Sequence, residues 1–509
     1  IISIFTLISR LLGLIRDMVI AHVFGAKLAA DAFFVAFRIP NLFRRLFAEG
    51  AMTVSFVPIF SESLNRSREE AKETAETLFS LMLVVLTLVS FLGVLFSPLI
   101  VRLIAYGFLD NPQKFDLTVF LTRLMFPYLI LVSLAAIGMG ILNSVKHFAA
   151  PAAGPILMNI GVIIGALFFI HWVDPPVVGL AIGVLLGGIL QLMVQIPFLK
   201  REGFFPRWRW NLKHPSVNKL GKMMLPSAYG AAVYQFNVIL ITLLASFLAS
   251  GSVSYLWYAD RVMEFPLGVF SIALATAILP TLSDFAARKE LQQLKATFNY
   301  GLRLIFFVTI PASCGLIVLA GPIVRLLYEH GNFGVEEAAA TQSALQLFAL
   351  GLPFISGVRM TSNAFYSMQD AKTPVRAANL SVICNLLFCL LFLKPWGHNG
   401  LALAVSLSSV FNFVLHIVHF RKKVGLIGFR SILSSLIRQL LASGVMSLVL
   451  FFILAHWPQA VGAHSVWRQM PFLLGLIAVG VAVYFLLSWI LRSREVGELF
   501  SMIHKRAAS

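Results

Sequence analysis

The feature that most constrains this chain is the succession of long apolar runs along its whole length. Of its 509 residues, 59% are hydrophobic and 12% are charged, and the mean hydropathy is +0.87. A helix needs about 20 apolar residues to cross a bilayer. The runs therefore exclude a soluble domain and predict an all-α polytopic membrane protein.

Glycines, prolines and charges divide the sequence into fourteen apolar runs, which predict 14 transmembrane helices. The runs lie near 1–24, 31–60, 78–105, 118–143, 151–171, 177–199, 222–247, 254–283, 299–328, 338–366, 375–394, 399–420, 431–455 and 471–491.

The distribution of Lys and Arg predicts the orientation. With the N-terminus inside, the inside segments carry 26 of the 40 Lys and Arg residues. The outside loops carry only Lys27, Lys114, Lys394 and Arg468. By the positive-inside rule both termini are cytoplasmic. The rule also accounts for most of the net charge of +18, so the charge gives no reason to expect a nucleic-acid partner.

An internal repeat organises the chain. Segments 97–107 and 321–331 read SPLIVRLIAYG and GPIVRLLYEHG. Three matching pairs are each 223 positions apart: Arg38 and Arg261, Arg102 and Arg325, Pro151 and Pro374. An even number of helices per repeat makes the halves parallel, and transporters of this plan bind substrate between the repeats and open the site alternately to each side. We expect two six-helix lobes at 1–199 and 222–420, joined by a linker at 200–221. Two extra helices and a cytoplasmic tail follow at 421–509.

Charged residues interrupt the runs at bilayer depth. Such a side chain costs at least about 2.5–3.5 kcal/mol at the bilayer centre, so these residues should face a watery interior. In the second run, Asp31, Arg38 and Arg45 are spaced by seven and share a helix face. The set is Arg10, Arg16, Arg38, Arg44, Arg45 and Arg261, with Asp17, Asp31, Glu49, Asp260 and Glu264.

Two interpretations of this set stay open. One is an internal salt-bridge network that holds the helices together. The other is a cavity whose spare guanidinium groups bind an anionic substrate, because the planar fork matches phosphate and carboxylate. Four further arginines fit positions at the membrane interface: Arg102, Arg123, Arg325 and Arg359.

Other signals are weak. Cys314, Cys384 and Cys389 lie in apolar runs and predict buried thiols, and no spacing of Cys and His suggests a metal or another cofactor. The basic and aromatic segment 200–215 favours a linker on anionic headgroups over a nucleic-acid site. No cleavable signal peptide is expected, although a short piece is expected to precede Ile1.

The motifs SRLLGLIRD, DAFFVAFRIPNLFRRLFAEGA, SFLASGSVS and YADRVMEFPLGV closely resemble the MurJ (MviN) lipid II flippases of bacterial peptidoglycan synthesis. The resemblance runs essentially end to end. It implies a multidrug/oligosaccharidyl-lipid/polysaccharide (MOP, MATE-like) exporter fold. It also implies transfer of the undecaprenyl-diphosphate-linked disaccharide-pentapeptide to the outer leaflet of the bacterial inner membrane, with cell-wall machinery as a further contact.

The resemblance also suggests site residues. The cavity arginines of the family fall on Arg10, Arg16, Arg44 and Arg261, and its cavity acid falls on Asp31. Asn41, Glu49 and Ser254 match motif positions, and Arg45 and Glu264 complete the candidate substrate-binding set. The last two helices are expected to line a groove for the lipid tail, or else to be accessory helices. A monomer is expected, and the absence of a carboxylate beside Asn237 and Asn385 puts a sodium site in doubt.

Three alternative functions make different demands on the sequence. A drug exporter of the same fold needs a buried acid that is not neutralised, whereas every candidate acid here lies beside an arginine. A flippase for another lipid-linked oligosaccharide differs only in the motifs. A membrane glycosyltransferase or phosphatase needs an acid/base or metal constellation, which the sequence does not offer, so we expect no enzyme.

Overall fold

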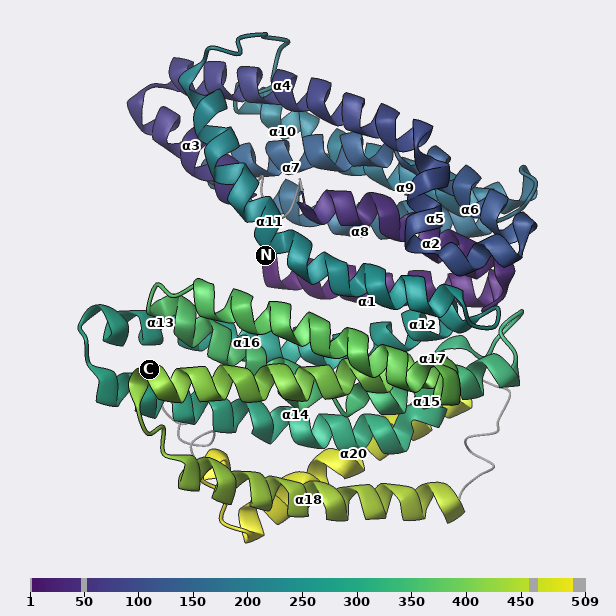
Figure 1. Ribbon diagram of the computed structural model, residues 1–509, viewed down its shortest axis with the longest axis vertical. Helices are drawn as coiled ribbons and strands as arrows, with labels where there is room; N and C mark the ends of the chain where they lie inside the picture. Colours follow the sequence, from purple (N-terminus) through teal and green to yellow (C-terminus); the bar gives the residue numbers. More distant parts are fainter. Residues whose placement is uncertain (1, 47–52, 457–465, 498–509) are drawn as a thin grey trace. The chain divides into compact units, whose positions relative to one another are not determined.

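The computed structural model describes residues 2–46, 53–456 and 466–497, and within these ranges the chain is helical and contains no strand (Figure 1). The all-helical prediction is therefore confirmed. The elements in chain order are α1 (Ile2–Phe24), α2 (Leu28–Arg44), α3 (Thr53–Arg66), α4 (Arg68–Leu95), α5 (Ser97–Ile104), η2 (Tyr106–Asp110), α6 (Pro112–Met125), α7 (Tyr128–Ser144), α8 (Ala149–Leu167), η3 (Phe169–His171), α9 (Val178–Met193), α10 (Ile196–Arg201), α11 (Pro215–Ser246), α12 (Ser252–Pro266), η4 (Leu267–Ser271), α13 (Ile272–Ala287), α14 (Leu291–Tyr328), α15 (Val335–Ala349), α16 (Leu352–Ser367), α17 (Lys372–Val424), α18 (Phe429–His456) and α20 (Val466–Ile490).

Within the described ranges, fewer helices than the fourteen predicted spans have the length and apolar composition of a membrane span. Among the described residues, nine helices could cross a membrane, or ten if the bent pair α15 and α16 counts as one span. The fourteen predicted spans are thus not established. The helix α1 lies outside the nine and carries Arg10, Arg16 and Asp17. The long helix α17 breaks at Gly397, whose φ of 55° is accessible to glycine.

The contacts divide the chain into two compact units. Unit 1 comprises residues 1–254 and 331–333, and unit 2 comprises residues 255–330 and 334–509. The core of unit 1 packs aromatic and aliphatic residues of α3, α4 and α7, among them Phe56, Phe60 and Ile137. The helix α11 belongs to unit 1, and the lobe bounds derived from the repeat stay a prediction.

Glycines bring the helices α8 and α9 of unit 1 into backbone contact. A Cβ at Gly161 would lie 2.4 Å from the backbone nitrogen of Gly187, and one at Gly165 would lie 2.5 Å from the carbonyl oxygen of Gly179. Small residues at such positions let helices approach closely in lipid, where van der Waals packing replaces the hydrophobic effect as the force between helices.

The helical stretch from Ser252 to Ala287, most of which belongs to unit 2, is interrupted by a π turn. The turn η4 covers Leu267–Ser271 and follows Pro266, which lacks the N–H that a regular helix would use. The Ser271 Oγ lies 2.6 Å from the Ser356 Oγ of α16, so the turn is tied to a neighbouring helix.

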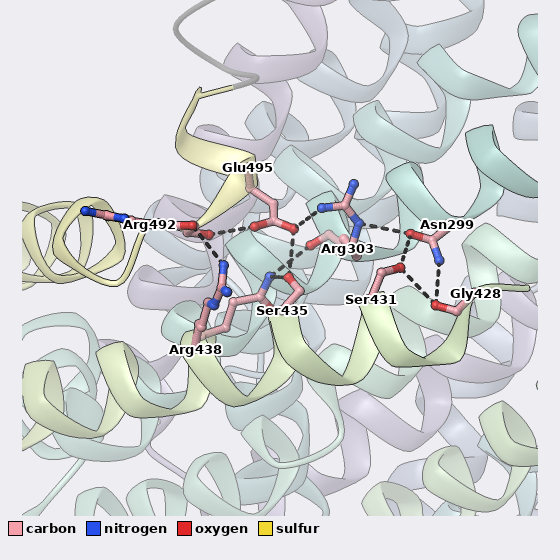
Figure 2. Close-up of polar contacts among 10 residues, drawn as sticks. Asn299, Arg303, Gly428, Ser431, Ser435, Arg438, Arg492 and Glu495 are labelled. Atoms are coloured by element: carbon pink, nitrogen blue, oxygen red, sulfur yellow. Dashed lines mark hydrogen bonds and ion pairs between the residues drawn. The ribbon is translucent and has the colours of Figure 1, made fainter.

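A buried ion pair joins the C-terminal part of unit 2 to α14 (Figure 2). Arg303 Nη1 lies 2.6 Å from Glu495 Oε1, and the two side chains are 9% and 1% exposed. Ser435 of α18 and Ser493 donate hydroxyl hydrogen bonds of 2.7 and 2.6 Å to the same carboxylate. Burial favours the protonated acid, but these hydrogen bonds and the Arg303 charge outweigh it and lower the pKa of Glu495.

The pair extends into a network along α18. Gln439 Nε2 donates to Ser435 Oγ over 2.8 Å and to the Arg303 carbonyl over 3.2 Å. On the other side, Arg303 Nε donates to Asn299 Oδ1 over 3.0 Å. The network thus links α14, α18 and the segment after α20 through polar groups rather than through apolar packing alone (Figure 2).

Glu495→Gln should destabilise unit 2, because it leaves the buried Arg303 guanidinium without its charge partner. Removing one member of a buried ion pair costs about 3–5 kcal/mol. The matched control is Asp284→Asn, whose pair with Arg288 is largely exposed, with side chains 63% and 51% exposed, and should cost less than about 1 kcal/mol. Thermal unfolding of the purified protein in detergent measures both. Equal melting temperatures for the two variants would contradict the structural role of Glu495.

Candidate functional site

Arg16 of α1 is held in place from two sides. Its Nε and Nη2 donate to Asp17 Oδ1 over 3.0 and 2.8 Å, and its Nη1 donates to Asn159 Oδ1 of α8 over 3.1 Å. Asn159 in turn donates to the Ser9 carbonyl over 3.0 Å, so the amide is fixed by α1 itself. The side chain of Arg16 remains 11% exposed. These three bonds use three of its five N–H donors.

Arg10 lies on the same helix, six residues before Arg16. It is half-buried, as are Arg44 and Arg45 at the end of α2. None of these three arginines is fully exposed, although each carries a charge in a chain whose helices are largely apolar.

Asp31 has the most complete set of partners among the candidate residues. It is 1% exposed, and its Oδ2 lies 2.7 Å from the Nζ of Lys114 on α6. The same carboxylate accepts backbone N–H bonds from Gly251 and Ser254 over 2.7 and 2.9 Å, and the Ser254 hydroxyl over 2.6 Å. An acid accepting N–H groups at the first turn of a helix, here α12, satisfies donors that no intrahelical bond uses.

Lys114 is the partner that sequence reasoning missed. Charge counting assigned it to an outside loop, yet it is 6% exposed, and its Nζ also lies 4.1 Å from the centroid of the Phe108 ring. Its place in the first turn of α6, just before a long apolar stretch, is the only sequence signal that could have indicated burial. Asp31 and Ser254 are 223 positions apart, the period of the repeat, so they occupy matching repeat positions.

The polar residues that follow Asp31 on α2 form hydrogen bonds with different partners. Arg38 Nη1 donates to the Thr242 hydroxyl of α11. Arg44 Nε donates to Asn41 Oδ1 over 2.9 Å, and the Asn41 amide donates to the Phe37 carbonyl over 2.9 Å. Asn41 therefore orients Arg44. Glu49, also predicted for the site, lies outside the described residues.

Arg261 and Glu264 of α12 pair with each other in unit 2. The Arg261 Nη1 lies 2.7 Å from Glu264 Oε2, and the two side chains are 30% and 41% exposed. The Arg261 Cζ also lies 4.7 Å from the centroid of the Trp257 ring, a cation–π contact. The predicted spacing of one helical turn thus gives a direct ion pair.

The arginines of α1 and α2 offer guanidinium donors to an anionic ligand. In the described part of the chain, no group of three or more His, Cys, Asp or Glu side chains is placed to hold a metal ion. Arg16 and Arg44 are both oriented by an asparagine amide oxygen, which is a neutral acceptor. Asp17 also accepts from Arg16, so the amide of Asn159 adds an orienting contact to an existing ion pair.

Lys114→Gln should destabilise unit 1, because the Asp31 carboxylate would stay buried without a cation. The expected cost is about 3–5 kcal/mol, and the double variant Asp31→Asn/Lys114→Gln should recover part of it. Lys219→Gln is the matched control, since the pair of Lys219 with Glu62 is 49% and 44% exposed and should contribute less than about 1 kcal/mol. Thermal unfolding measures these three variants and Asp31→Asn alone, and additive losses of the two single variants in the double variant would exclude a direct coupling.

Known proteins share both the sequence and the fold. The family model for "Lipid II flippase MurJ" matches residues 20–472. "Probable lipid II flippase MurJ" of Haemophilus influenzae is 39% identical over 428 residues, covering 81% of this chain and 83% of the relative. "Lipid II flippase MurJ" of Burkholderia cenocepacia is 36% identical, covering 83% of both chains.

Two solved structures give the fold. "Lipid II flippase MurJ, inward closed conformation" has a TM-score of 0.80 and 28% identity, covering 96% of this chain and 98% of that one. An inward-facing multidrug resistance MATE family transporter of the MOP superfamily has a TM-score of 0.69, covering 82% of this chain and 95% of that one; at 14% identity it supports the fold alone. The expected MOP-like fold is confirmed. The chain belongs to the MurJ family of lipid II flippases, which are multi-pass membrane transporters of the bacterial inner membrane rather than enzymes.

Proposed function

We propose that this chain binds the headgroup of lipid II through the arginines of α1 and α2 and carries it from the inner to the outer leaflet by alternating access. Arg16 carries the proposal, because Asp17 and Asn159 hold its guanidinium in one orientation while part of it remains exposed. A diphosphate or a peptide carboxylate presents paired oxygens that match such a fork.

The candidate residues take different roles in this proposal. Arg10, Arg16, Arg44 and Arg45 bind the anionic headgroup, and Asn41 orients Arg44. Asp31 and Ser254 bind each other and so serve the structure of unit 1. Arg261 and Glu264, in unit 2, form a partly exposed pair, from which an incoming anion could draw the guanidinium.

The finer architecture is part of the same proposal. It has fourteen membrane spans in two parallel six-helix lobes at 1–199 and 222–420, a linker at 200–221, and two final helices at 421–509. The excess of Lys and Arg in the predicted inside loops supports cytoplasmic termini. We propose that the monomer is the transporting unit.

Arg16→Ala and Arg44→Ala should each abolish transport while the protein stays folded and inserted. Loss of charge-assisted hydrogen bonds of about 1.5–3 kcal/mol each should weaken headgroup binding by about tenfold to a hundredfold. Arg102→Ala is the control, because Arg102 is exposed and its Cζ lies 5.9 Å from the centroid of the Tyr106 ring.

Two measurements compare Arg16→Ala and Arg44→Ala with the control Arg102→Ala. The first is the growth of cells that depend on the variant as their only lipid II flippase. The second is native mass spectrometry of the purified protein with lipid II and undecaprenyl phosphate offered together. Normal growth and unchanged lipid II retention in Arg16→Ala, at an unchanged melting temperature, would show that Arg16 does not bind the substrate.

A further inference from the structure

The segment between α10 and α11 runs along the side of α4 in unit 1 (Figure 1). Residues 204–211 are not helical. Phe204 is buried and packs edge-on against Phe60 of α3, with ring centroids 5.4 Å apart. Further on, the Arg209 backbone N–H donates to the Ser80 hydroxyl over 2.9 Å. The segment is therefore fixed to α3 and α4 at two points.

Arg209 gives the segment an inner face. Its Nη2 lies 2.7 Å from Glu73 Oε1, and its Nη1 lies 4.0 Å from Glu76 Oε2. Both acids belong to the early turns of α4. The acids neutralise this one cation and hold its side chain against the helix.

The neighbours of Arg209 form an outer face. Trp208, Trp210 and Leu212 are 63%, 50% and 54% exposed. The two indole rings are stacked, with centroids 6.0 Å apart and planes 8° apart. Alternation of this kind is what an extended chain produces, since successive side chains point to opposite sides. Trp208 and Trp210 thus lie together on the side opposite the Arg209 side chain, and Leu212 is exposed two residues further on.

The sequence of α4 gives the depth at which this face lies. Charged residues fill the helix as far as Glu76, and an apolar stretch begins at Leu78. At 1.5 Å per residue, Ser80 lies only about 3 Å beyond the start of that stretch. Because Arg209 contacts both Glu73 and Ser80, the segment spans the boundary between the polar and the apolar part of a membrane-crossing helix.

The segment also carries an excess of positive charge. Residues 200–213 carry four further exposed cations, Lys200, Arg201, Arg207 and Lys213, against a single acid, Glu202. Tryptophan is enriched at the level of lipid headgroups because its ring is apolar and its N–H is polar. Clustered Lys and Arg at the same level attract anionic lipids.

We propose that residues 200–213 form a membrane-interface anchor that binds anionic phospholipids of the bilayer holding the protein. Trp208, Trp210 and Leu212 enter the boundary between headgroups and acyl chains, and the exposed cations bind lipid phosphates. The anchor fixes the depth of unit 1 at the membrane face where α4 begins. This proposal is independent of what the arginines of α1 and α2 bind.

Depth-dependent fluorescence quenching tests the insertion. The full chain is reconstituted into vesicles of phosphatidylcholine and phosphatidylglycerol, brominated either near the headgroup or near the chain end. The signal of interest is the fluorescence lost on Trp208→Phe/Trp210→Phe, since the chain has eight tryptophans. Bromine near the headgroup should quench this component more strongly than bromine near the chain end. A component that neither lipid quenches would place the rings in water or against another molecule, and would overturn the proposal.

Lipid retention tests the charges. Native mass spectrometry compares phosphatidylglycerol with phosphatidylcholine on the wild type, on Arg207→Gln/Lys213→Gln and on the control Arg288→Gln/Lys289→Gln, which removes the same charge from exposed residues elsewhere. In Arg207→Gln/Lys213→Gln, the preference for phosphatidylglycerol over phosphatidylcholine should fall by roughly fivefold for each cation removed. The control should keep the preference of the wild type. Equal losses in both variants, or preferential retention of an added RNA oligonucleotide by the wild type, would overturn the proposal.

Discussion

The carboxylate of Asp31 joins three separate parts of unit 1, and their packing depends on its charge being met. An ion in a low-dielectric interior is tolerated only when paired and hydrogen-bonded. Lys114 supplies the cation from α6, and the first turn of α12 supplies two N–H groups and a hydroxyl. The position of α2 is thereby tied to α6 and to the beginning of α12. The arginines that follow on α2 are placed by the same constraint.

Each unit contains one closed buried ion pair, Asp31 with Lys114 in unit 1 and Glu495 with Arg303 in unit 2. Glu495 and Arg303 in unit 2 form a closed pair, with serine hydroxyls on the remaining lone pairs. Arg16 and Arg44 in unit 1 are instead oriented in part by neutral amides. A closed pair stabilises packing and has little capacity for a further ligand. The closed pairs fit the interpretation as a salt-bridge network, and the partly exposed Arg16, held by Asp17 and Asn159, is the residue proposed to bind the anionic headgroup.

Sequence patterns predicted the all-helical membrane fold because a long apolar run has few other stable structures. Family motifs predicted the flippase. The pairing of charges could not be predicted in the same way. Lys114 was assigned to an outside loop and Arg303 lies at the start of the predicted run 299–328, yet they bond acids 83 and 192 positions away in the chain. Helical spacing identifies residues on one face, as with Arg261 and Glu264, but partners on different helices depend on tertiary packing. Charged residues also affect the number of spans. The helix α1 carries Arg10, Arg16 and Asp17, and it is not among the nine helices that are apolar enough to cross a membrane.

The π turn at Leu267–Ser271 sets the rotation of α13 relative to α12. A π turn holds one more residue than an α turn, so it offsets the helical phase of everything that follows by about 100°. Arg261 lies before the turn, and the apolar face of α13 lies after it. Loss of a single residue within the turn would restore a regular helix, but it would rotate α13 and its buried Leu282 away from their partners. The extra residue therefore sets which face of α13 points to the core. A sequence alignment that omits this residue would match buried positions of α13 with exposed ones.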